Sequence, residues 1–311
     1  MQRKFNAEMR CQQEWGWLLS IWLFLSGTAC GLFLLYELVD LPAVFGLLSV
    51  GLLIVGGAVL LLEQGSPMRA WRAVSRIRTS WLSRGVIFVM LFLAFGVLAL
   101  ATAVLPDLAW SAGLARTLHA IAGLCALMIV LYPGFFLAAN RSVPFWHTPV
   151  LPVLLLASSA MGAFALVLAG SFQLPQGLQR IGELAAWSIL ANLALVLVHL
   201  LAMARSGGAA AKSVQLLGSG ALSWAFWGGV IVVGMAVPLA LLLWIASPSA
   251  LAGACMLVGC FVLRYCLLKA GVYIPAAIAQ QGLDFSRLNR SGGELEREYA
   301  AAAGSTDGGR S

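Results

Sequence analysis

The stretch from residue 51 to residue 85 decides the class of fold, because a long apolar run ends there among charged residues. Residues 51–63 read GLLIVGGAVLLLE, and residues 64–85 read QGSPMRAWRAVSRIRTSWLSRG. An apolar run of this kind is typical of a helix that crosses a hydrocarbon layer about 30 Å thick. A carboxylate at the end of such a helix is costly unless it is paired or used. The pattern therefore predicts a membrane helix that ends in a candidate functional residue, Glu63.

The composition indicates a polytopic membrane protein. The chain has 311 residues, of which 61% are hydrophobic and 10% are charged, and its mean hydropathy is +0.93. A soluble domain of this size needs far more charge on its surface. The net charge of +7 is carried mainly in loops between apolar segments, which favours contact with an anionic lipid leaflet over nucleic-acid binding.

The hydropathy pattern predicts an all-α fold with eight transmembrane helices, arranged as two packed four-helix bundles. Each apolar segment is about 20 residues long, which is enough to cross the hydrocarbon core. The predicted spans are residues 15–38, 41–62, 85–105, 115–138, 147–171, 181–203, 221–246 and 249–268. Gly27 and Gly31 form a GxxxG pair in the first span, a spacing that permits close helix contact.

The expected organisation is a basic N-terminal segment (1–14), a transmembrane domain (15–273) and a polar, partly disordered C-terminal tail (274–311). Eight spans place both termini on one face, the terminal face. Of the 19 lysine and arginine residues, only Arg116 and Arg180 fall in loops on the opposite face. The positive-inside rule then predicts that both termini lie in the cytoplasm.

Several polar and aromatic residues are predicted at a similar depth near the terminal face. Trp15 and Trp17 open the first span, Glu63 ends the second, and His147 opens the fifth. Tyr132 lies about 10 Å below that surface, at a rise of about 1.5 Å per residue. A quinone headgroup needs an apolar slot, a donor for each carbonyl oxygen and a group that exchanges protons. These residue types together favour a quinone site.

Each of these residues also has an ordinary structural role to weigh. The tryptophans can simply anchor the protein at the membrane interface. Glu63 can pair with Arg69 or Arg72, and His147 can be structural at a loop–helix junction. Tyr132 precedes Pro133, so its hydroxyl can instead satisfy a carbonyl that the proline leaves free.

Other membrane functions receive less support from the sequence. The six cysteines form no CxxC pair, so no iron–sulfur cluster or other metal site is expected in this chain. A b-type haem between His147 and His199 is a minor alternative, because such haems need two histidines at matching depth. A transporter would favour charged groups at mid-depth, where the predicted spans carry mainly Asn192.

In its motifs the chain resembles the NrfD/PsrC family, the membrane subunits of polysulfide reductase and related respiratory molybdenum enzymes. The resemblance runs from about Trp15 to Tyr273. It is carried by EWGWLLSIWLFLSGTACG in the first span, by the acid followed by SPMR after the second, and by SWLSRG before the third. LYPGFFLAANRSVPFW, HTPVLPVLLLASSAMGA and RYCLLKAGVY follow in order.

The resemblance implies a quinone (menaquinone or ubiquinone) bound between the first helices, and no haem. It implies partners too, a four-cluster ferredoxin-like iron–sulfur subunit and a molybdopterin catalytic subunit. The family's site carboxylate falls on Glu63 and its site tyrosine on Tyr132, which we predict to act in catalysis. Leu19 and Trp22 occupy positions where some members carry an asparagine and a histidine.

We therefore predict a quinone-binding subunit of an oxidoreductase complex, without the complex's catalytic centre. A structural assembly anchor and a small transporter remain the alternatives. The predicted quinone site comprises Trp17, Trp22, Glu63, Tyr132 and His147, and the predicted docking site for the iron–sulfur partner comprises Arg69, Arg72, Arg76, Arg78 and Arg84.

Overall fold

The computed structural model describes residues 11–13, 15–39, 41–63, 81–105, 110–170, 178–244 and 250–274. Within these ranges the chain is helical, apart from short connections. The helices are α1 (Trp17–Val39), α2 (Ala43–Glu63), α3 (Trp81–Val104), α4 (Ala112–Ala138), α5 (Val150–Ala169), α6 (Leu178–Arg205), α7 (Gly208–Gly218), the π-helix η3 (Ala225–Ala236), α8 (Val237–Trp244) and α9 (Ala250–Lys269).

Eight helices in the described ranges are long and apolar enough to cross a membrane, with η3 and α8 joined into one span. This confirms the all-helical fold and the predicted number of spans. Trp224 and Trp244 flank the ends of the seventh span and are highly exposed, as expected for aromatic residues at the two membrane interfaces. The short helix α7 was not predicted, because it falls in the loop expected between the sixth and seventh spans.

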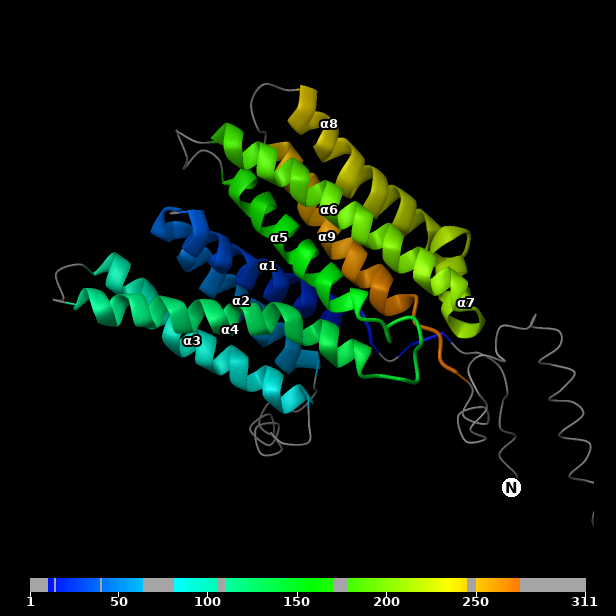
Figure 1. Cartoon of the computed structure of the whole chain (residues 1–311), viewed down its shortest axis with the longest axis horizontal. Coiled ribbons are helices and arrows are strands. Elements are labelled where there is room, and N and C mark those ends of the chain that lie inside the picture. The colour runs from blue at the N-terminus through cyan, green and yellow to red at the C-terminus, as the bar shows by residue number, and fades with distance from the viewer. Residues whose placement is uncertain are drawn as a thin grey trace, which may run out of the picture.

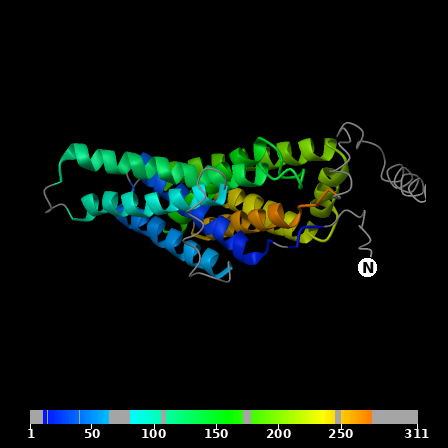
Figure 2. The same cartoon turned by 90° about the horizontal axis from the view of Figure 1, so that it is seen from below.

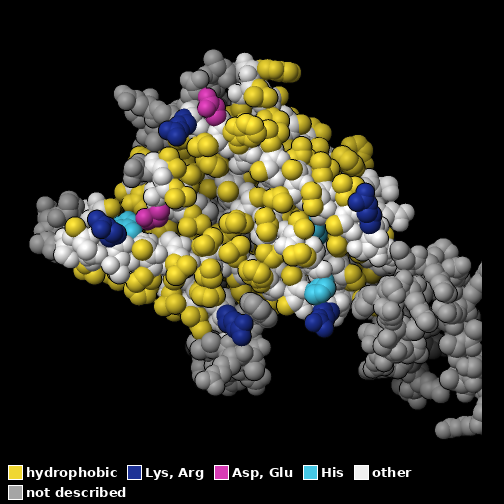
Figure 3. Space-filling model, viewed as in Figure 1, with side chains coloured by type: hydrophobic (Ala, Val, Ile, Leu, Met, Phe, Trp, Pro, Cys, Tyr) yellow, Lys and Arg dark blue, Asp and Glu magenta, His cyan; other side chains and the backbone are white. Residues whose placement is uncertain are grey.

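The helices form two groups that lie side by side (Figure 1). One group contains α1 to α4, and the other contains α5, α6, the η3–α8 span and α9. They meet where α1 and α4 pack against α5, and where α1 also touches α9. Seen from below, the helices run nearly parallel or antiparallel along one direction (Figure 2). The outer surface of the drawn face is mostly hydrophobic, with charged side chains near its edges (Figure 3).

The two groups approach closely at the glycines of the first helix. A Cβ atom on Gly31 would lie 2.5 Å from the backbone oxygen of Ser159 on α5. A Cβ atom on Gly27 would lie 2.7 Å from a guanidinium nitrogen of Arg264 on α9. The predicted GxxxG pair therefore sits at the junction between the two groups, where small residues let helix backbones pack.

Both ends of the membrane domain meet on one face. The Gln12 backbone N–H donates to the Gly271 carbonyl at 2.8 Å, and Cys11 pairs with Val272 in an isolated antiparallel bridge. The chain thus enters α1 and leaves α9 on the same side, which we continue to call the terminal face. The end segments predicted for 1–14 and 274–311 lie almost entirely outside the described residues, so their organisation stays a prediction.

One basic residue, Arg264, lies inside the helix assembly, although the charge count above assigned it to the terminal face. Arg264 is 2% exposed. Its guanidinium group donates to Ser158 Oγ at 2.8 Å, to Ser159 Oγ at 2.9 Å and to the Cys260 carbonyl at 3.1 Å. No carboxylate among the described residues pairs with it. Arg264 therefore ties α9 to α5 through hydroxyl groups, and its charge does not belong to the terminal-face loops.

Replacing Gly31 with alanine should lower the stability of the purified protein. The added methyl group would collide with the Ser159 backbone, and overpacking of this kind typically costs about 1–3 kcal/mol. Thermal unfolding in detergent, followed by circular dichroism, measures the effect. Gly51→Ala is the matched control, because a Cβ atom there meets nothing within 4 Å, so its melting temperature should be unchanged or higher. Equal melting temperatures for both variants would contradict the close approach.

Candidate functional site

A cavity of about 390 Å³ lies among the first four helices. Its walls come from α1 through Leu19, Trp22 and Leu23, and from α2 through residues between Leu53 and Leu61. The remaining walls are Gly85, Val86, Val89, Met90 and Leu93 of α3 and Tyr132, Pro133, Phe136 and Leu137 of α4. Almost all of these side chains are apolar, so the cavity suits a flat hydrophobic ring system.

Among the described residues that line this cavity, Tyr132 is the one that carries a hydroxyl group. The ring lies directly over Gly85 of α3, where a Cβ atom would come within 2.5 Å of Tyr132 Cζ. On its own helix the ring stacks on Phe136, with 6.0 Å between centroids. Because Gly85 has no side chain, the Tyr132 ring can lie against α3 at this point of the cavity wall.

The Tyr132 hydroxyl has no hydrogen-bond partner within the described part of the chain. The alternative in which it satisfies a carbonyl freed by Pro133 is therefore not observed there. Pro133 and Gly134 have another effect, because a Cβ atom on Gly134 would lie 2.3 Å from Pro152 Cα. The kink-forming pair thus lets α4 approach α5 closely, and the phenol is left available to a ligand.

Trp22 and Trp17 lie in different surroundings. Trp22 is 7% exposed and lines the cavity, and its indole ring carries one N–H donor. Trp17 is 57% exposed and stacks on Tyr265 of α9, with centroids 4.4 Å apart. The structure therefore brings Trp22 together with Tyr132 and places Trp17 outside the cavity lining.

His147 also lies outside the cavity lining. It is exposed in the connection between α4 and α5, and its Nδ1 atom lies 2.6 Å from the Ala138 carbonyl oxygen. Donation to that carbonyl assigns the ring proton to Nδ1 and holds the imidazole against the end of α4. This hydrogen bond ties the connection between α4 and α5 to the end of α4.

The position of Glu63 is known from its backbone. Glu63 is the last residue of α2, and Leu60 and Leu61, just before it, line the cavity. Arg69, Arg72, Arg76 and Arg78 lie outside the described ranges. Arg84 lies within them, as the neighbour of Gly85 on α3.

An aromatic stack that was not predicted from the sequence leads from the cavity toward the terminal face. Phe136 stacks on Trp15 with 5.7 Å between centroids, and Trp15 stacks on Trp146 at 4.9 Å with the rings almost parallel. Trp146 is fully buried and donates its indole N–H to the Leu267 carbonyl at 2.8 Å. The stack fixes α4, the entry to α1 and the end of α9 around one side of the cavity.

The described residues contain no group of three or more His, Cys, Asp or Glu side chains that could hold a metal ion. His199, the other histidine weighed for haem, is buried and packs edge-on against Phe145 at 4.8 Å. His147 is exposed and bonded to a carbonyl. The apolar cavity and its phenol are therefore the features of this region that fit an organic ligand.

Comparison with known proteins adds the family. The family model described as "Polysulphide reductase, NrfD" matches residues 6–276, nearly the whole chain. The chain belongs to the NrfD family. As a member with eight apolar helices, it is a multi-pass membrane protein. The cavity and all of its walls lie within the matched region.

Three curated relatives show how far the similarity extends. Protein NrfD of Escherichia coli is 31% identical over 302 residues, covering 83% of this chain and 94% of that protein. A chain of the polysulfide reductase of Wolinella succinogenes is 26% identical over 305 residues, with the same coverage of 83% and 94%. A subunit of the sulfite dehydrogenase of Allochromatium vinosum is 32% identical over 181 residues, covering 52% of this chain and 53% of that one.

Replacing Gly85 with alanine should weaken ligand binding in the cavity. The new methyl group would push the Tyr132 ring into the space that it now borders, and we expect the affinity for menadione, a naphthoquinone without a tail, to fall at least tenfold, about 1.4 kcal/mol. Isothermal titration calorimetry on the purified protein measures this change.

Gly96→Ala, on the same helix, is the matched control for Gly85→Ala. A Cβ atom on Gly96 meets the Phe92 ring at 3.5 Å, which is an ordinary contact. Binding by this variant should equal that of the unmodified protein. Undiminished binding by Gly85→Ala would show that the cavity does not take the ring.

Proposed function

We propose that this protein is a quinone-binding membrane subunit that exchanges electrons between the quinone pool and an iron–sulfur partner. The observation that supports this function best is the apolar cavity of about 390 Å³ among α1 to α4, with the Tyr132 hydroxyl in its lining. A quinone ring is flat and apolar except at its two carbonyl oxygens, so a cavity of this chemistry matches both parts.

Within the cavity, Tyr132 donates a hydrogen bond to one carbonyl oxygen. Trp22 lines the same cavity and offers its indole N–H for the second oxygen. This donor belongs to the first helix, at the position where some relatives are expected to carry histidine. A change from imidazole to indole keeps a donor and removes a proton acceptor. Trp22 can therefore position a ring, and proton exchange is left to another residue.

Glu63 is the proposed proton-exchanging residue. It follows directly after the pocket-lining end of α2, at the terminal face. A carboxylate at the edge of an apolar cavity can take up and release protons. Oxidation of a quinol releases two electrons and two protons, so Glu63 passes protons toward water while electrons leave to the partner. Reduction of a quinone uses the same residues, with electrons and protons moving in the opposite direction.

The proposed partners are an iron–sulfur subunit of the four-cluster ferredoxin-like type and a molybdopterin catalytic subunit. The names of two relatives, from a polysulfide reductase and a sulfite dehydrogenase, describe components of larger redox assemblies. The basic segment with Arg69, Arg72, Arg76, Arg78 and Arg84 follows Glu63 in sequence and would dock the iron–sulfur partner next to the quinone site. The family and its bacterial relatives support a location in a bacterial inner membrane, and the charge asymmetry supports cytoplasmic termini.

Two substitutions test the function in the assembled complex. Tyr132→Phe removes one hydroxyl and should lower quinol-linked turnover about tenfold or more, as expected for the loss of a hydrogen bond to a reacting group. Glu63→Gln keeps the size of the side chain and should abolish turnover. Both variants should still copurify with their partner subunits.

Tyr265→Phe is the matched control, because Tyr265 stacks on Trp17 outside the cavity lining. It should leave turnover unchanged. Normal turnover in both Tyr132→Phe and Glu63→Gln would overturn the proposed site. Electron flow that ignores quinone-site inhibitors would favour an assembly anchor, and solute movement by the chain alone in vesicles would favour a transporter.

A further inference from the structure

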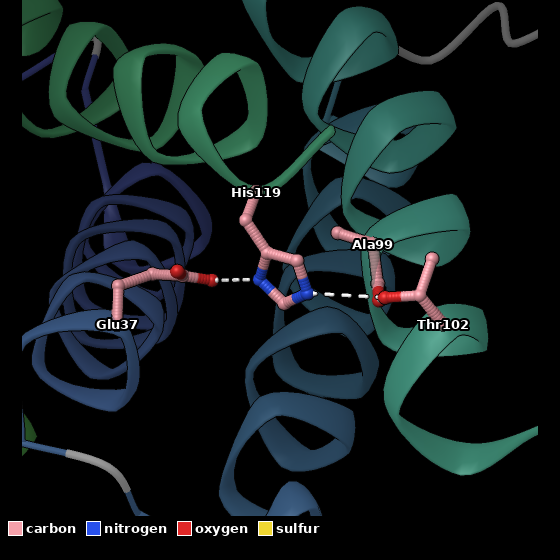
Figure 4. Close-up of polar contacts among 4 residues, drawn as sticks. All are labelled: Glu37, Ala99, Thr102 and His119. Carbon is pink, nitrogen blue, oxygen red and sulfur yellow. Dashed lines mark hydrogen bonds and ion pairs between the residues drawn. The ribbon is translucent and has the colours of Figure 1, made fainter. Parts of the chain in front are cut away.

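A second polar site lies at the end of the first helix group that is opposite to the terminal face. It joins Glu37 near the end of α1, Thr102 near the end of α3 and His119 in the second turn of α4 (Figure 4). Glu37 Oε1 lies 2.6 Å from His119 Nδ1, and Thr102 Oγ1 lies 3.3 Å from His119 Nε2. Neither the quinone proposal nor the family resemblance uses these residues.

The hydrogen bonds determine how many protons this site holds. The Thr102 hydroxyl lies 2.7 Å from the Ala99 carbonyl, closer than its 3.3 Å distance to the histidine. The shorter bond takes the single hydroxyl proton, so Thr102 accepts from His119 Nε2–H. The contact between Nδ1 and the carboxylate then needs a proton of its own. With this arrangement of donors, the pair would carry two protons in total, as imidazolium with carboxylate or as imidazole with carboxylic acid.

The site opens into a cavity of about 330 Å³, lined by Tyr36, Glu37, Leu41 and His119. The side chains of His119 and Glu37 are 21% and 24% exposed. The pair is therefore not sealed inside the helix group.

Few other titratable groups in the described part of the chain surround the pair. Among the described residues, Tyr36 places its ring 6.3 Å from the His119 ring, and Arg116 lies one turn earlier on α4. The nearby described part of α2 begins at Ala43 and offers no titratable group. The contact from α3 is the hydroxyl group of Thr102, which does not titrate.

Toward the interior, aromatic side chains separate this site from the apolar cavity. Phe33 of α1 and Phe92 of α3 are both fully buried and meet edge-on at 4.9 Å. Phe33 also contacts Tyr36, with 5.8 Å between centroids. The pair therefore faces its own end of the helix group.

We propose that Glu37, His119 and Thr102 form a proton-exchange site at the membrane face opposite the terminal face. Besides the Nε2 proton that His119 donates to Thr102, the pair shares a second proton between Nδ1 and the Glu37 carboxylate. Thr102 fixes the ring so that Nδ1 faces the carboxylate. The cavity passes this proton to and from the aqueous phase. An ordinary structural ion pair would tie α1 to α4 in the same way, but it would not need a proton that comes and goes through the cavity.

Nuclear magnetic resonance of the full chain in lipid nanodiscs, with ¹⁵N-labelled histidine, tests the proton count. The chain has only three histidines, so His119→Gln and His147→Gln assign the signals. Infrared spectra of the carboxyl stretch report whether Glu37 carries the proton. At neutral pH we expect two protons on the Glu37–His119 pair and, in Glu37→Gln, one ring proton on His119.

Thr102→Val keeps the shape of the side chain and should remove the Nε2–H signal typical of a bonded ring. His147, at the opposite end, is the internal control and should be unchanged in both variants. A single proton on the unmodified pair, with ionised Glu37 and neutral His119, would overturn the proposal.

Exchange of the shared proton for deuterium, after transfer into deuterated water, tests whether the proton leaves through the cavity. Leu41→Trp narrows the cavity from a lining residue that supplies none of the pair's polar atoms, and it should slow exchange of the shared proton at least tenfold. An unchanged exchange rate would show that the proton does not leave through this cavity. Neither measurement involves a quinone or a partner subunit, so its outcome is independent of the proposed function.

Discussion

The structure depends on the close approach of α1 to α5 and α9. Inside a membrane, helices gain little from the hydrophobic effect between them, so small residues and local hydrogen bonds must hold the groups together. Gly27 and Gly31 provide that surface on α1, and Ser159 of α5 and Arg264 of α9 fill it. The helix that joins the two groups also carries Trp22 at one end and Glu37 at the other. Its packing therefore sets the geometry of both polar regions.

The polar groups of the first helix group that are discussed above lie at two levels. Near the terminal face, Tyr132 and Trp22 line an apolar cavity, and Glu63 ends the helix beside it. At the other end, Glu37 and His119 share a hydrogen bond. The core between them contains Phe33 and Phe92, which are fully buried. In the first helix group the ionisable side chains named above therefore lie toward the membrane edges, where solvation costs less than at mid-depth. Arg264 differs, because its guanidinium group is buried between α9 and α5.

Much of the architecture was predictable, and part of the site was as well. Apolar runs long enough to span a bilayer predict the transmembrane helices directly. Helix α7 was missed because it is short and lies in a segment of mixed polar and apolar residues. Tyr132 and Trp22 were predicted and do line one cavity, but Trp17 and His147 face other surroundings because side-chain direction depends on helix rotation. The pairing of Glu37 with His119 joins positions 82 residues apart. An acid and a histidine near the ends of two apolar spans are the signal that could have found it.

The sequence by itself determined the class of protein, the eight spans, the shared face of the termini and the family, because these follow from composition, hydropathy and ordered motifs. Only the tertiary structure decided which side chains meet. It placed Tyr132 over Gly85, stacked Trp15 on Trp146, buried Arg264 among serines and brought His119 to Glu37. Hydropathy locates each span, and the position of a residue within its span gives its approximate depth in the membrane. Contacts depend also on the rotation and crossing of each helix, which packing alone sets.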